Sequence, residues 1–467
     1  MINAAPTIDI QKLTISADTS IQDIFAHFAA KPWAMLLDTC NSRKSNGRFD
    51  IMVADPVITY ETRGKVTRIH YTLSDAVTQS TDDPFVLLDQ GFTSFMDSVS
   101  VPDAPTDLPF LCGALGYFAY DLGRHIERLP ELATTEINAP DMAVGLYSWS
   151  VIKDNISGEF YLARLPHLPA PTPEAIETLA QLKRPPTFFQ LTSDWQANMS
   201  KQTYTNKINR ILDYLAAGDC YQVNFAQRFN ATYDGDEWQA YTSLCEANQS
   251  PFSAFIRLAD SCVMSISPER FLSVNDGQVQ TKPIKGTRPR AADPEQDALL
   301  QQQLQQSEKD RAENLMIVDL LRNDISKACT PGSVKVPKLF EIESYAAVHH
   351  LVSTVEGELQ HDATVMDLLR GAFPGGSITG APKVRAMEII EELEPNRRHV
   401  YCGSIGYIGV KRDMDTSICI RTLQTYQGSI YCWAGGGIVM DSSPDSEYQE
   451  SLDKVSKILP VLEKCSG

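Results

Sequence analysis

Residues 267–287 read SPERFLSVNDGQVQTKPIKGT, and this stretch predicts two strands folded back on each other. Asp276-Gly277 stands between two runs of strand-forming residues, which is a strong signal for a tight β-hairpin turn. A turn at that point places Glu269 on one strand nearly opposite Lys285 on the returning strand. A proline and a glycine flank the lysine closely, so its ammonium group is presented on a stiff turn.

The direction of these two side chains decides what the hairpin can do. With a plain two-residue turn Glu269 and Lys285 point to opposite faces, whereas an odd loop or a bulge puts them on the same face. On one face they form either a cross-strand salt bridge or a pair suited to proton transfer and covalent chemistry. The hairpin alone leaves both interpretations open.

The chain has 467 residues, of which 43% are hydrophobic and 21% are charged, so it can bury a large core. The formal net charge is −18 and no Lys/Arg-rich block occurs, which argues against nucleic-acid or anionic-membrane binding. The ten cysteines are scattered without zinc-like spacing. We therefore expect buried free thiols in a reducing, cytoplasmic compartment. We expect no signal peptide in residues 1–10 and no membrane-spanning segment.

The chain divides at a proline-rich stretch. We expect an N-terminal region at 1–166, a connector at 167–195 and a catalytic region at 196–467. The predicted strands lie at 34–37, 85–88, 145–152, 278–283, 400–410, 414–425 and 429–438. The predicted helices lie at 202–217, 307–328, 381–393 and 444–459. This irregular order of strands and helices favours an α+β fold over a parallel α/β sheet.

Two predicted helices carry carboxylates one turn apart. Asp310 and Glu313 lie on the helix that begins near residue 307, and Glu447 and Glu450 lie on the last helix. Like charges at this spacing destabilise a helix slightly. Either both faces are solvated, or the carboxylates hold a hard divalent cation between the helices. The pattern alone leaves both alternatives open.

Two glycine-rich segments offer backbone amides to an anion. Residues 371–383 read GAFPGGSITGAPK and lead into a helix, whose free N-terminal amides favour a carboxylate. Alanine stands where a P-loop needs lysine, so nucleotide binding is disfavoured. Gly435-Gly436-Gly437 follows a strand and either binds an anion or forms a simple bulge. His349-His350 is either a structural or a catalytic pair.

Taken together, these segments are similar to the chorismate-utilising enzymes. The similarity covers most of the chain and runs through segments at 113–121, 218–224, 267–271, 283–287, 312–324, 349–353, 375–383 and 435–437. So many motifs in one order are far more specific than any single motif. The resemblance implies an α+β fold of two packed antiparallel sheets flanked by helices, with the chorismate site between the sheets. It also favours the functional interpretation of each motif.

The pentad at 283–287 separates the branches of this family. In anthranilate synthases the pentad looks like Pro-Ile-Ala-Gly-Thr. This chain has Lys285 in place of the alanine, which resembles the branch that forms 4-amino-4-deoxychorismate for p-aminobenzoate and folate. The resemblance implies that Lys285 attacks C2 of chorismate as hydroxide leaves C4, with Glu269 protonating the leaving group. Ammonia then attacks C4 and expels the lysine. Gln222 stands near the lysine that activates water in isochorismate and salicylate synthases, so attack by water is disfavoured.

The resemblance also assigns the other site residues. Glu313 and Glu450 correspond to Mg²⁺ ligands, with Asp310 and Glu447 as neighbours of the metal, which would bind the ring carboxylate. His350 corresponds to the histidine near the ring hydroxyl. The residues implied in substrate binding are Thr287, Ser377, Tyr401, Arg421, Gly435, Gly436, Gly437, Lys454 and Gln222.

Partners follow from the same resemblance. No glutamine-hydrolysing nucleophile motif is present, so we expect a separate glutamine amidotransferase subunit to supply ammonia. Residues 36–40 read LLDTC where tryptophan-inhibited relatives read Leu-Leu-Glu-Ser. This departure argues against feedback inhibition and leaves open a structural tryptophan in the N-terminal region. The alternatives are an anthranilate synthase component I and, in another class, a non-catalytic tryptophan-binding regulatory protein.

Overall fold

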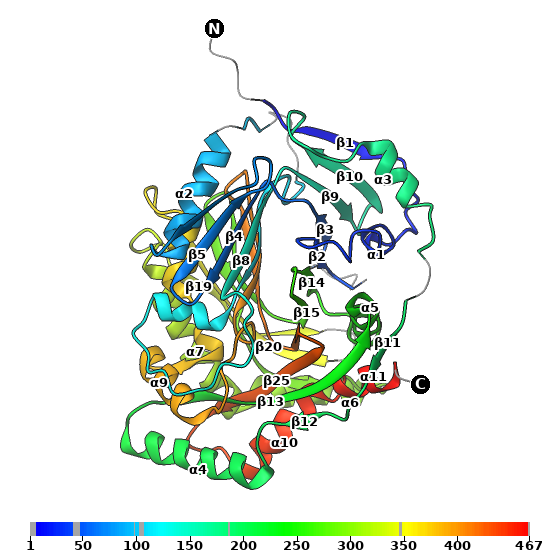
Figure 1. Cartoon of the computed structure of the whole chain (residues 1–467). Coiled ribbons are helices and arrows are strands. Elements are labelled where there is room, and N and C mark those ends of the chain that lie inside the picture. The colour runs from blue at the N-terminus through cyan, green and yellow to red at the C-terminus, as the bar shows by residue number, and fades with distance from the viewer. Residues whose placement is uncertain are drawn as a thin grey trace.

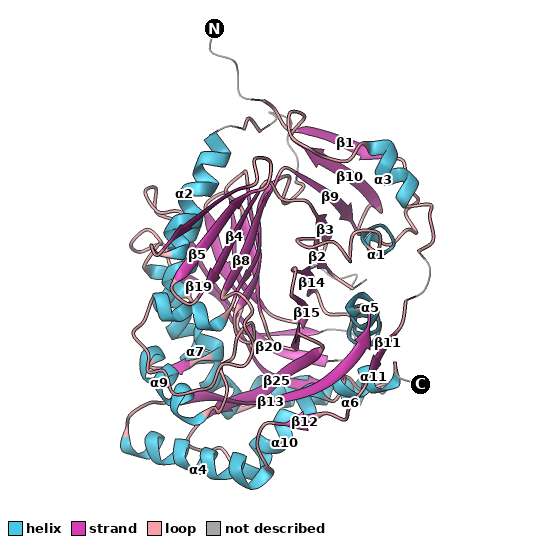
Figure 2. Ribbon diagram, in the orientation of Figure 1, coloured by secondary structure: helices cyan, strands magenta, loops and turns pink. Residues whose placement is uncertain are grey.

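The computed structural model describes residues 6–40, 47–97, 99–101, 107–184, 187–344 and 348–465. Within these residues two large antiparallel sheets face each other, and helices lie outside them (Figure 2). This arrangement confirms the expected α+β fold of two packed sheets. Residues 185 and 186, which belong to the expected connector at 167–195, lie outside the described residues.

The first sheet curves along one side and the lower end of the molecule in Figure 1. Its spatial order is β1 (Asp9–Leu13), β10 (Glu159–Arg164), β9 (Trp149–Asp154), β3 (Phe49–Val53), β2 (Met35–Asp38), β14 (Phe252–Arg257), β15 (Ser261–Ser267), β24 (Thr422–Tyr426), β25 (Ser429–Ile438), β13 (Gln222–Gly235) and β11 (Phe189–Leu191). Two short strands, β12 (Gln196–Ala197) and β21 (Gly380–Ala381), also pair with β13.

The second sheet lies opposite the first. Its spatial order is β18 (Ile284–Pro289), β20 (Val348–Glu358), β17 (Gln278–Thr281), β16 (Arg270–Asn275), β23 (Met414–Ile418), β22 (Ser404–Gly409), β7 (Gly113–Phe118), β8 (Met142–Tyr147), β4 (Ile58–Arg63), β5 (Val66–Tyr71) and β6 (Ala76–Ser80), and β19 (Lys335–Ser344) also pairs with β20. Each sheet combines a block of strands from each half of the chain, and the blocks meet where β2 pairs with β14 and where β7 pairs with β22.

Helices cover the outer faces of the two sheets. They are α1 (Ile21–Phe25), α2 (Pro84–Asp97), α3 (Pro173–Leu179), α4 (Lys201–Ala217), α5 (Glu237–Asn248), α6 (Pro294–Gln306), α7 (Glu308–Ser326), α8 (Val365–Ala372), α9 (Lys383–Leu393), α10 (Pro444–Val455) and α11 (Leu459–Lys464), with 3₁₀ turns η1 (Tyr120–His125) and η2 (Gly376–Ile378). The helices α4, α7, α9 and α10 gather around the lower end in Figure 1.

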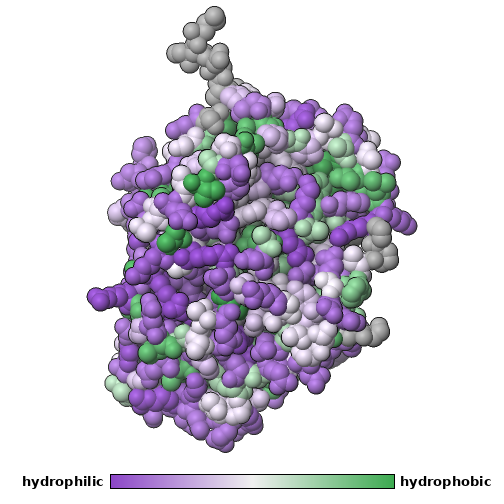
Figure 3. Space-filling model, in the orientation of Figure 1, coloured by the Kyte–Doolittle hydropathy of each residue, from purple (hydrophilic) through white to green (hydrophobic). Residues whose placement is uncertain are grey.

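Apolar side chains from both sheets fill the space between them. Met35 and Val263 of the first sheet belong to one buried cluster with Leu115 and Ile405 of the second. Burying such side chains stabilises the fold by roughly 1.5–3 kcal/mol each. The face in Figure 3 is mostly hydrophilic, with hydrophobic side chains scattered over it. No helix in the described parts of the chain is long and apolar enough to cross a membrane.

Three predicted strands differ from the structure. The strand predicted at 145–152 is split between the end of β8 and β9, which belong to different sheets. The strand predicted at 85–88 is wrong, because these residues lie in α2, where Asp83 accepts a hydrogen bond from the Phe85 amide at 2.9 Å. The strand predicted at 414–425 is split into β23 and β24, which belong to different sheets. Arg421 adopts a left-handed conformation (φ 51°) at this split, and the chain crosses from the second sheet to the first there.

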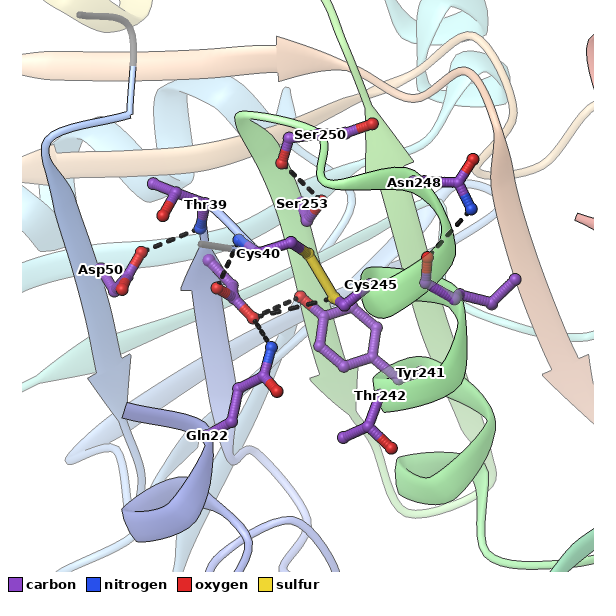
Figure 4. The surroundings of a disulfide bond; sticks show 12 residues. Gln22, Thr39, Cys40, Asp50, Tyr241, Thr242, Cys245, Asn248, Ser250 and Ser253 are labelled. Atoms are coloured by element: carbon purple, nitrogen blue, oxygen red, sulfur yellow. Dashed lines mark hydrogen bonds between the residues drawn. A yellow bond between two sulfur atoms is a disulfide. The ribbon is translucent and has the colours of Figure 1, made fainter. Parts of the chain in front are cut away.

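The expectation of free thiols holds for eight of the ten cysteines, seven of them buried. It is wrong for Cys40 and Cys245, which form a disulfide between the end of β2 and α5 (Figure 4). Asp38 lies beside this bond and accepts hydrogen bonds from the Cys40 amide at 2.7 Å and the Tyr241 hydroxyl at 3.3 Å. Scattered cysteines cannot be paired from sequence alone, which is why the sequence does not predict this bond.

Candidate active site

The candidate site lies where the chain crosses between the two sheets. Glu269 follows β15 of the first sheet and precedes β16 of the second, and Arg421 stands at the neighbouring crossing between β23 and β24. Backbone hydrogen bonds tie the two crossings together, because Ile418 donates to the Glu269 carbonyl and Ile266 donates to the Arg421 carbonyl. At such crossings side chains leave the regular alternation of a strand, so they are free to face a common site.

Glu269 is buried, with 8% of its surface exposed. The Ser377 hydroxyl donates a hydrogen bond to Glu269 Oε1 at 3.3 Å. Burial raises the pKa of Glu269 to about 7, although the nearby Lys285 and the Ser377 hydrogen bond act in the opposite direction. A carboxyl group with such a pKa carries a proton over much of the neutral range and can serve as an acid.

Lys285 meets Glu269 at the same serine. Its Nζ donates to the Ser377 carbonyl at 3.4 Å. Burial lowers the pKa of Lys285, against the attraction of Glu269 and Glu313. The next residue, Gly286, has φ 83°, and a Cβ there would lie 2.9 Å from the carboxyl carbon of Asp310. Glycine therefore lets the lysine strand approach α7 closely.

The hairpin forms as predicted, with Asp276-Gly277 as a two-residue turn between β16 and β17. The returning strand does not stay regular: β17 ends at Thr281, and the register of β18 against β20 shifts between Ile284 and Thr287. Lys285 therefore does not stand opposite Glu269 across the hairpin as predicted, because β18 pairs with β20, and β20 and β17 separate it from β16 in the sheet. The two side chains meet through Ser377, and among the described residues they form no direct ion pair.

The four predicted metal-binding carboxylates line the same region in two pairs. Burial raises the pKa of Glu313, and its neighbours Asp310 and Glu450 raise it further. Glu447 is 6% exposed and accepts a hydrogen bond from the Ser442 hydroxyl at 2.7 Å. Asp310 pairs with Arg288 at 3.0 Å.

This donor set fits Mg²⁺. Within the described residues no three of these carboxylates bring oxygens within 4.8 Å of one another, so they do not form a closed cage. Mg²⁺ is usually held by one or two carboxylates while it keeps water and takes oxygens from the substrate. The fit rests on hard oxygen donors that are held close enough to raise one another's pKa.

The strand β25 presents its glycines to α10. A Cβ on Gly436 would lie 3.1 Å from Glu450 Oε1 and 3.3 Å from Glu447 Oε2, so a larger residue would crowd both carboxylates. Lys454 donates to the Gly435 carbonyl at 2.7 Å and pairs with Glu450 at 2.7 Å. On the neighbouring strand Gln222 lies against Gly437, and its buried Nε2 has no hydrogen-bond partner among the described residues.

A histidine and an arginine complete the arrangement. The Thr287 hydroxyl and His350 Nδ1 lie 2.8 Å apart. Burial and the nearby Arg421 lower the pKa of His350 to about 4, so this imidazole is neutral at pH 7. Burial also lowers the pKa of Arg421. An anion bound beside the guanidinium would favour its charged form and raise this pKa again. His349, in contrast, bonds Ser344 and Asp297 outside this group.

Tyr401 is a predicted site residue that lies within the core. It is 3% exposed and stacks on Trp433, with ring centroids 6.2 Å apart. Sequence reasoning also missed two residues near the site. Arg398 reaches the turn that holds Ser377, and Lys383 bonds Asp324 at 2.7 Å at the end of the same loop. Lys383 had a sequence signal, its place at the end of the glycine-rich segment, whereas Arg398, which follows α9, had none.

The fold and this site define a class of protein. The chain belongs to the family described as chorismate binding enzyme, which matches residues 55–460.

Individual relatives are more specific. The chain is 53% identical to "Aminodeoxychorismate synthase component 1" of Klebsiella aerogenes, over 94% of this chain and 96% of that protein. It is 52% identical to the protein of the same name from Escherichia coli K12, over 94% and 95%. Among solved structures, anthranilate synthase component I from Streptococcus pneumoniae superposes with a TM-score of 0.76 at 30% identity, over 89% of this chain and 93% of that one.

Proposed function

We propose that the chain aminates chorismate at C4 and forms 4-amino-4-deoxychorismate, with ammonia as the nitrogen source. The observation that carries this proposal is that the buried Glu269 and the partly buried Lys285 meet at Ser377. Burial favours the neutral amine and the neutral acid. These are the forms that a nucleophile and a proton donor need. The names of the relatives at 53% and 52% identity support the same reaction.

The proposed chemistry consists of two displacements. The Lys285 amine forms a bond to C2, the ring double bonds shift, and the C4–O bond breaks as Glu269 gives its proton to the departing hydroxyl. Water leaves. Ammonia then bonds to C4, the double bonds shift back, and the C2–N bond to Lys285 breaks. Lys285 leaves as the neutral amine, and the new ammonium group at C4 gives one proton back to Glu269, so the site is restored.

The remaining groups bind the substrate, which carries two carboxylates. We propose that Glu313 and Glu450 hold Mg²⁺, with Asp310 and Glu447 beside it, and that a bound Mg²⁺ would neutralise the ring carboxylate. Arg421, Lys454 and the amides of Gly435–Gly437 offer positive charge and donors for carboxylate oxygens. Neutral His350 with Thr287 faces the ring substituents, and Gln222, which cannot act as a base, disfavours attack by water.

The product assay is the experiment that tests this function. The purified chain, chorismate, Mg²⁺ and an ammonium salt are incubated, and the products are separated by chromatography. We expect 4-amino-4-deoxychorismate. Anthranilate as the main product would favour the anthranilate synthase alternative, and no chorismate consumption would favour the non-catalytic regulatory protein.

A separate glutaminase partner belongs to the same proposal. The words "component 1" in the names of the relatives support a second component, and we propose that it is a glutamine amidotransferase subunit that supplies ammonia in the cytoplasm. The isolated chain should then use ammonia and not glutamine. Turnover of glutamine by the purified chain alone would contradict a separate subunit.

We also propose that an aromatic amino acid, tryptophan, binds at the N-terminal region, in a cavity that this region shares with the catalytic region. This cavity of about 170 Å³ lies between the two sheets. Its lining includes Asp38, Thr39, Phe252, Arg270, Tyr407 and Asp415. A carboxylate, a guanidinium and aromatic rings suit the ammonium, carboxylate and ring of one zwitterion. Calorimetric titration of the chain with L-tryptophan checks this, with Asp38→Asn as the variant expected to bind more weakly. Absence of binding heat and of thermal stabilisation would contradict it.

A further inference from the structure

A buried ion pair lies behind the candidate site. Arg398 follows α9 and is 1% exposed, and Glu394 is 5% exposed. The guanidinium donates from Nε to Glu394 Oε2 at 2.9 Å and from Nη2 to Oε1 at 2.7 Å. Its planar face also lies over the rings of Tyr120 and Tyr401, at 4.8 and 5.7 Å from their centroids. This double hydrogen bond fixes the orientation of the guanidinium.

The same guanidinium holds two backbone carbonyls. Nη1 donates to the Ile378 carbonyl at 3.0 Å, and Nη2 donates to the Asn224 carbonyl at 2.7 Å. Glu394 adds a third backbone contact, because its Oε1 accepts from the Ala226 amide at 2.9 Å. The ion pair therefore forms hydrogen bonds with two separate backbone segments, η2 and β13.

Both segments carry site residues. Ile378 follows Ser377, whose hydroxyl bonds Glu269 and whose carbonyl accepts from Lys285. On β13, Asn224 pairs with Gly437 and Ala226 pairs with Gly435. One planar group thus links the turn that contacts the proposed acid and nucleophile to the strand pair that presents the glycine amides.

We propose that Arg398, oriented by Glu394, is a positioning residue that sets the Ser377 turn against β13 in the amination reaction. This inference rests on the proposed function, for which Arg398 touches no reacting atom. Lysine cannot replace it, because an ammonium lacks the flat fork that reaches two carbonyls and a carboxylate in one plane. A misplacement of about 1 Å of the reacting groups can lower a rate roughly 10²-fold.

The experiment compares Arg398→Lys with the wild-type chain, with ammonia as donor so that no second subunit is needed. We expect kcat to fall by roughly 10²-fold, with a much smaller change in the KM for chorismate, because the carboxylate-binding groups are retained. The upper limb of the pH profile should also move to higher pH, because Glu269 loses the Ser377 hydrogen bond that lowers its pKa. A purely structural role would leave this limb in place.

A double-mutant cycle with Ser377→Ala tests the route of the effect. If Arg398 acts through this turn, the two substitutions together should cost about 10-fold less than the product of their separate effects. The matched control is Arg385→Lys, a partly exposed arginine on α9 that pairs with Glu388 and Asp219. It should keep wild-type kcat and the wild-type pH profile.

Thermal melting shows whether Arg398→Lys is folded, since breaking a buried ion pair is costly. If it is not, Glu394→Gln keeps the shape and should give a smaller change of the same kind in kcat and in the pH limb. A folded variant with unchanged kcat and an unchanged upper limb of the pH profile would overturn the inference. So would a double variant with Ser377→Ala whose loss of kcat equals the product of the two separate losses. A wild-type chain that forms no 4-amino-4-deoxychorismate would instead refute the proposed function, and this inference with it.

Discussion

Ser377 and Glu269 are joined by a hydrogen bond of 3.3 Å from the serine hydroxyl to the buried carboxyl group. The carbonyl of the same serine accepts from Lys285, so one residue of the glycine-rich segment contacts both members of the proposed acid–nucleophile pair. Burial pushes each toward its neutral form. A neutral acid and a neutral amine can sit close together without the charge cost that a buried ion pair would carry.

This relationship predicts how activity depends on pH. Because the pKa of Glu269 is raised to about 7, its acid form is present below that pH and is lost above it. At constant free ammonia, kcat/KM for chorismate should therefore fall above pH 7. In Ser377→Ala this fall in kcat/KM should move to higher pH. The wild-type hydrogen bond from Ser377 lowers the pKa of Glu269, so its loss raises that pKa. Steady-state rates between pH 5.5 and about 9 measure this. An unshifted limb in Ser377→Ala would assign it to another group.

Replacement of Lys285 predicts a change of product. Lys285→Ala should lose most formation of 4-amino-4-deoxychorismate and gain some anthranilate, because the pentad then resembles that of the alanine-bearing relatives. Mass spectrometry of the wild-type protein after chorismate without ammonia should show an adduct of chorismate minus water on Lys285. Lys282→Ala, which removes the partner of Glu343 on the same segment, should keep the adduct. Wild-type rate and product in Lys285→Ala would rule out covalent catalysis.

The carboxylates of α7 and α10 predict a binding effect that can be measured without turnover. Mg²⁺ should raise the melting temperature of the wild-type chain. Binding adds about 2.7 kcal/mol to the free energy of unfolding when free Mg²⁺ is 100 times its Kd. The rise should be much smaller in Glu313→Gln and Glu450→Gln, and chelator should abolish amination. Glu463→Gln, an exposed carboxylate on α11, is the control. Equal stabilisation of Glu313→Gln and the wild type would contradict this site.

The sequence predicts the Asp276-Gly277 turn better than it predicts several of the strands around it. The turn reflects local chemistry, so it could be read from adjacent residues. The crossing at Arg421 could not, because a β-rich run looks the same whether it stays in one sheet or passes to another. Residues 85–88 were misread for a related reason: a short apolar run does not reveal whether its period is 2 or 3.6.

The pairing of β18 with β20 and the role of Arg398 were also out of reach. This pairing, with a strand some sixty residues later, decides where Lys285 lies relative to Glu269. Arg398 lies in a polar stretch after α9, where an arginine is ordinarily exposed. Only the packing of three distant segments around it produces the buried ion pair.

The Cys40–Cys245 bond leads to the last prediction. It closes a loop with a sequence separation of 205, which removes conformational entropy from the unfolded chain worth about 5 kcal/mol in the loop-closure account. Cys40→Ser, or reductant added to the wild type, should therefore lower the melting temperature by several degrees. Cys465→Ser, which removes a free thiol, should not.

Alkylation of the denatured, unreduced protein provides the direct count of thiols. We expect eight of the ten cysteines to be modified, and a tryptic peptide pair that joins Cys40 to Cys245. Because Asp38 and Thr39 line the cavity just before Cys40, reduction should also weaken the binding of L-tryptophan in calorimetry. Ten modified cysteines, together with a melting temperature that reductant does not change, would show that Cys40 and Cys245 are not bonded in solution. Neither the stability of the fold nor the binding of L-tryptophan would then depend on this disulfide.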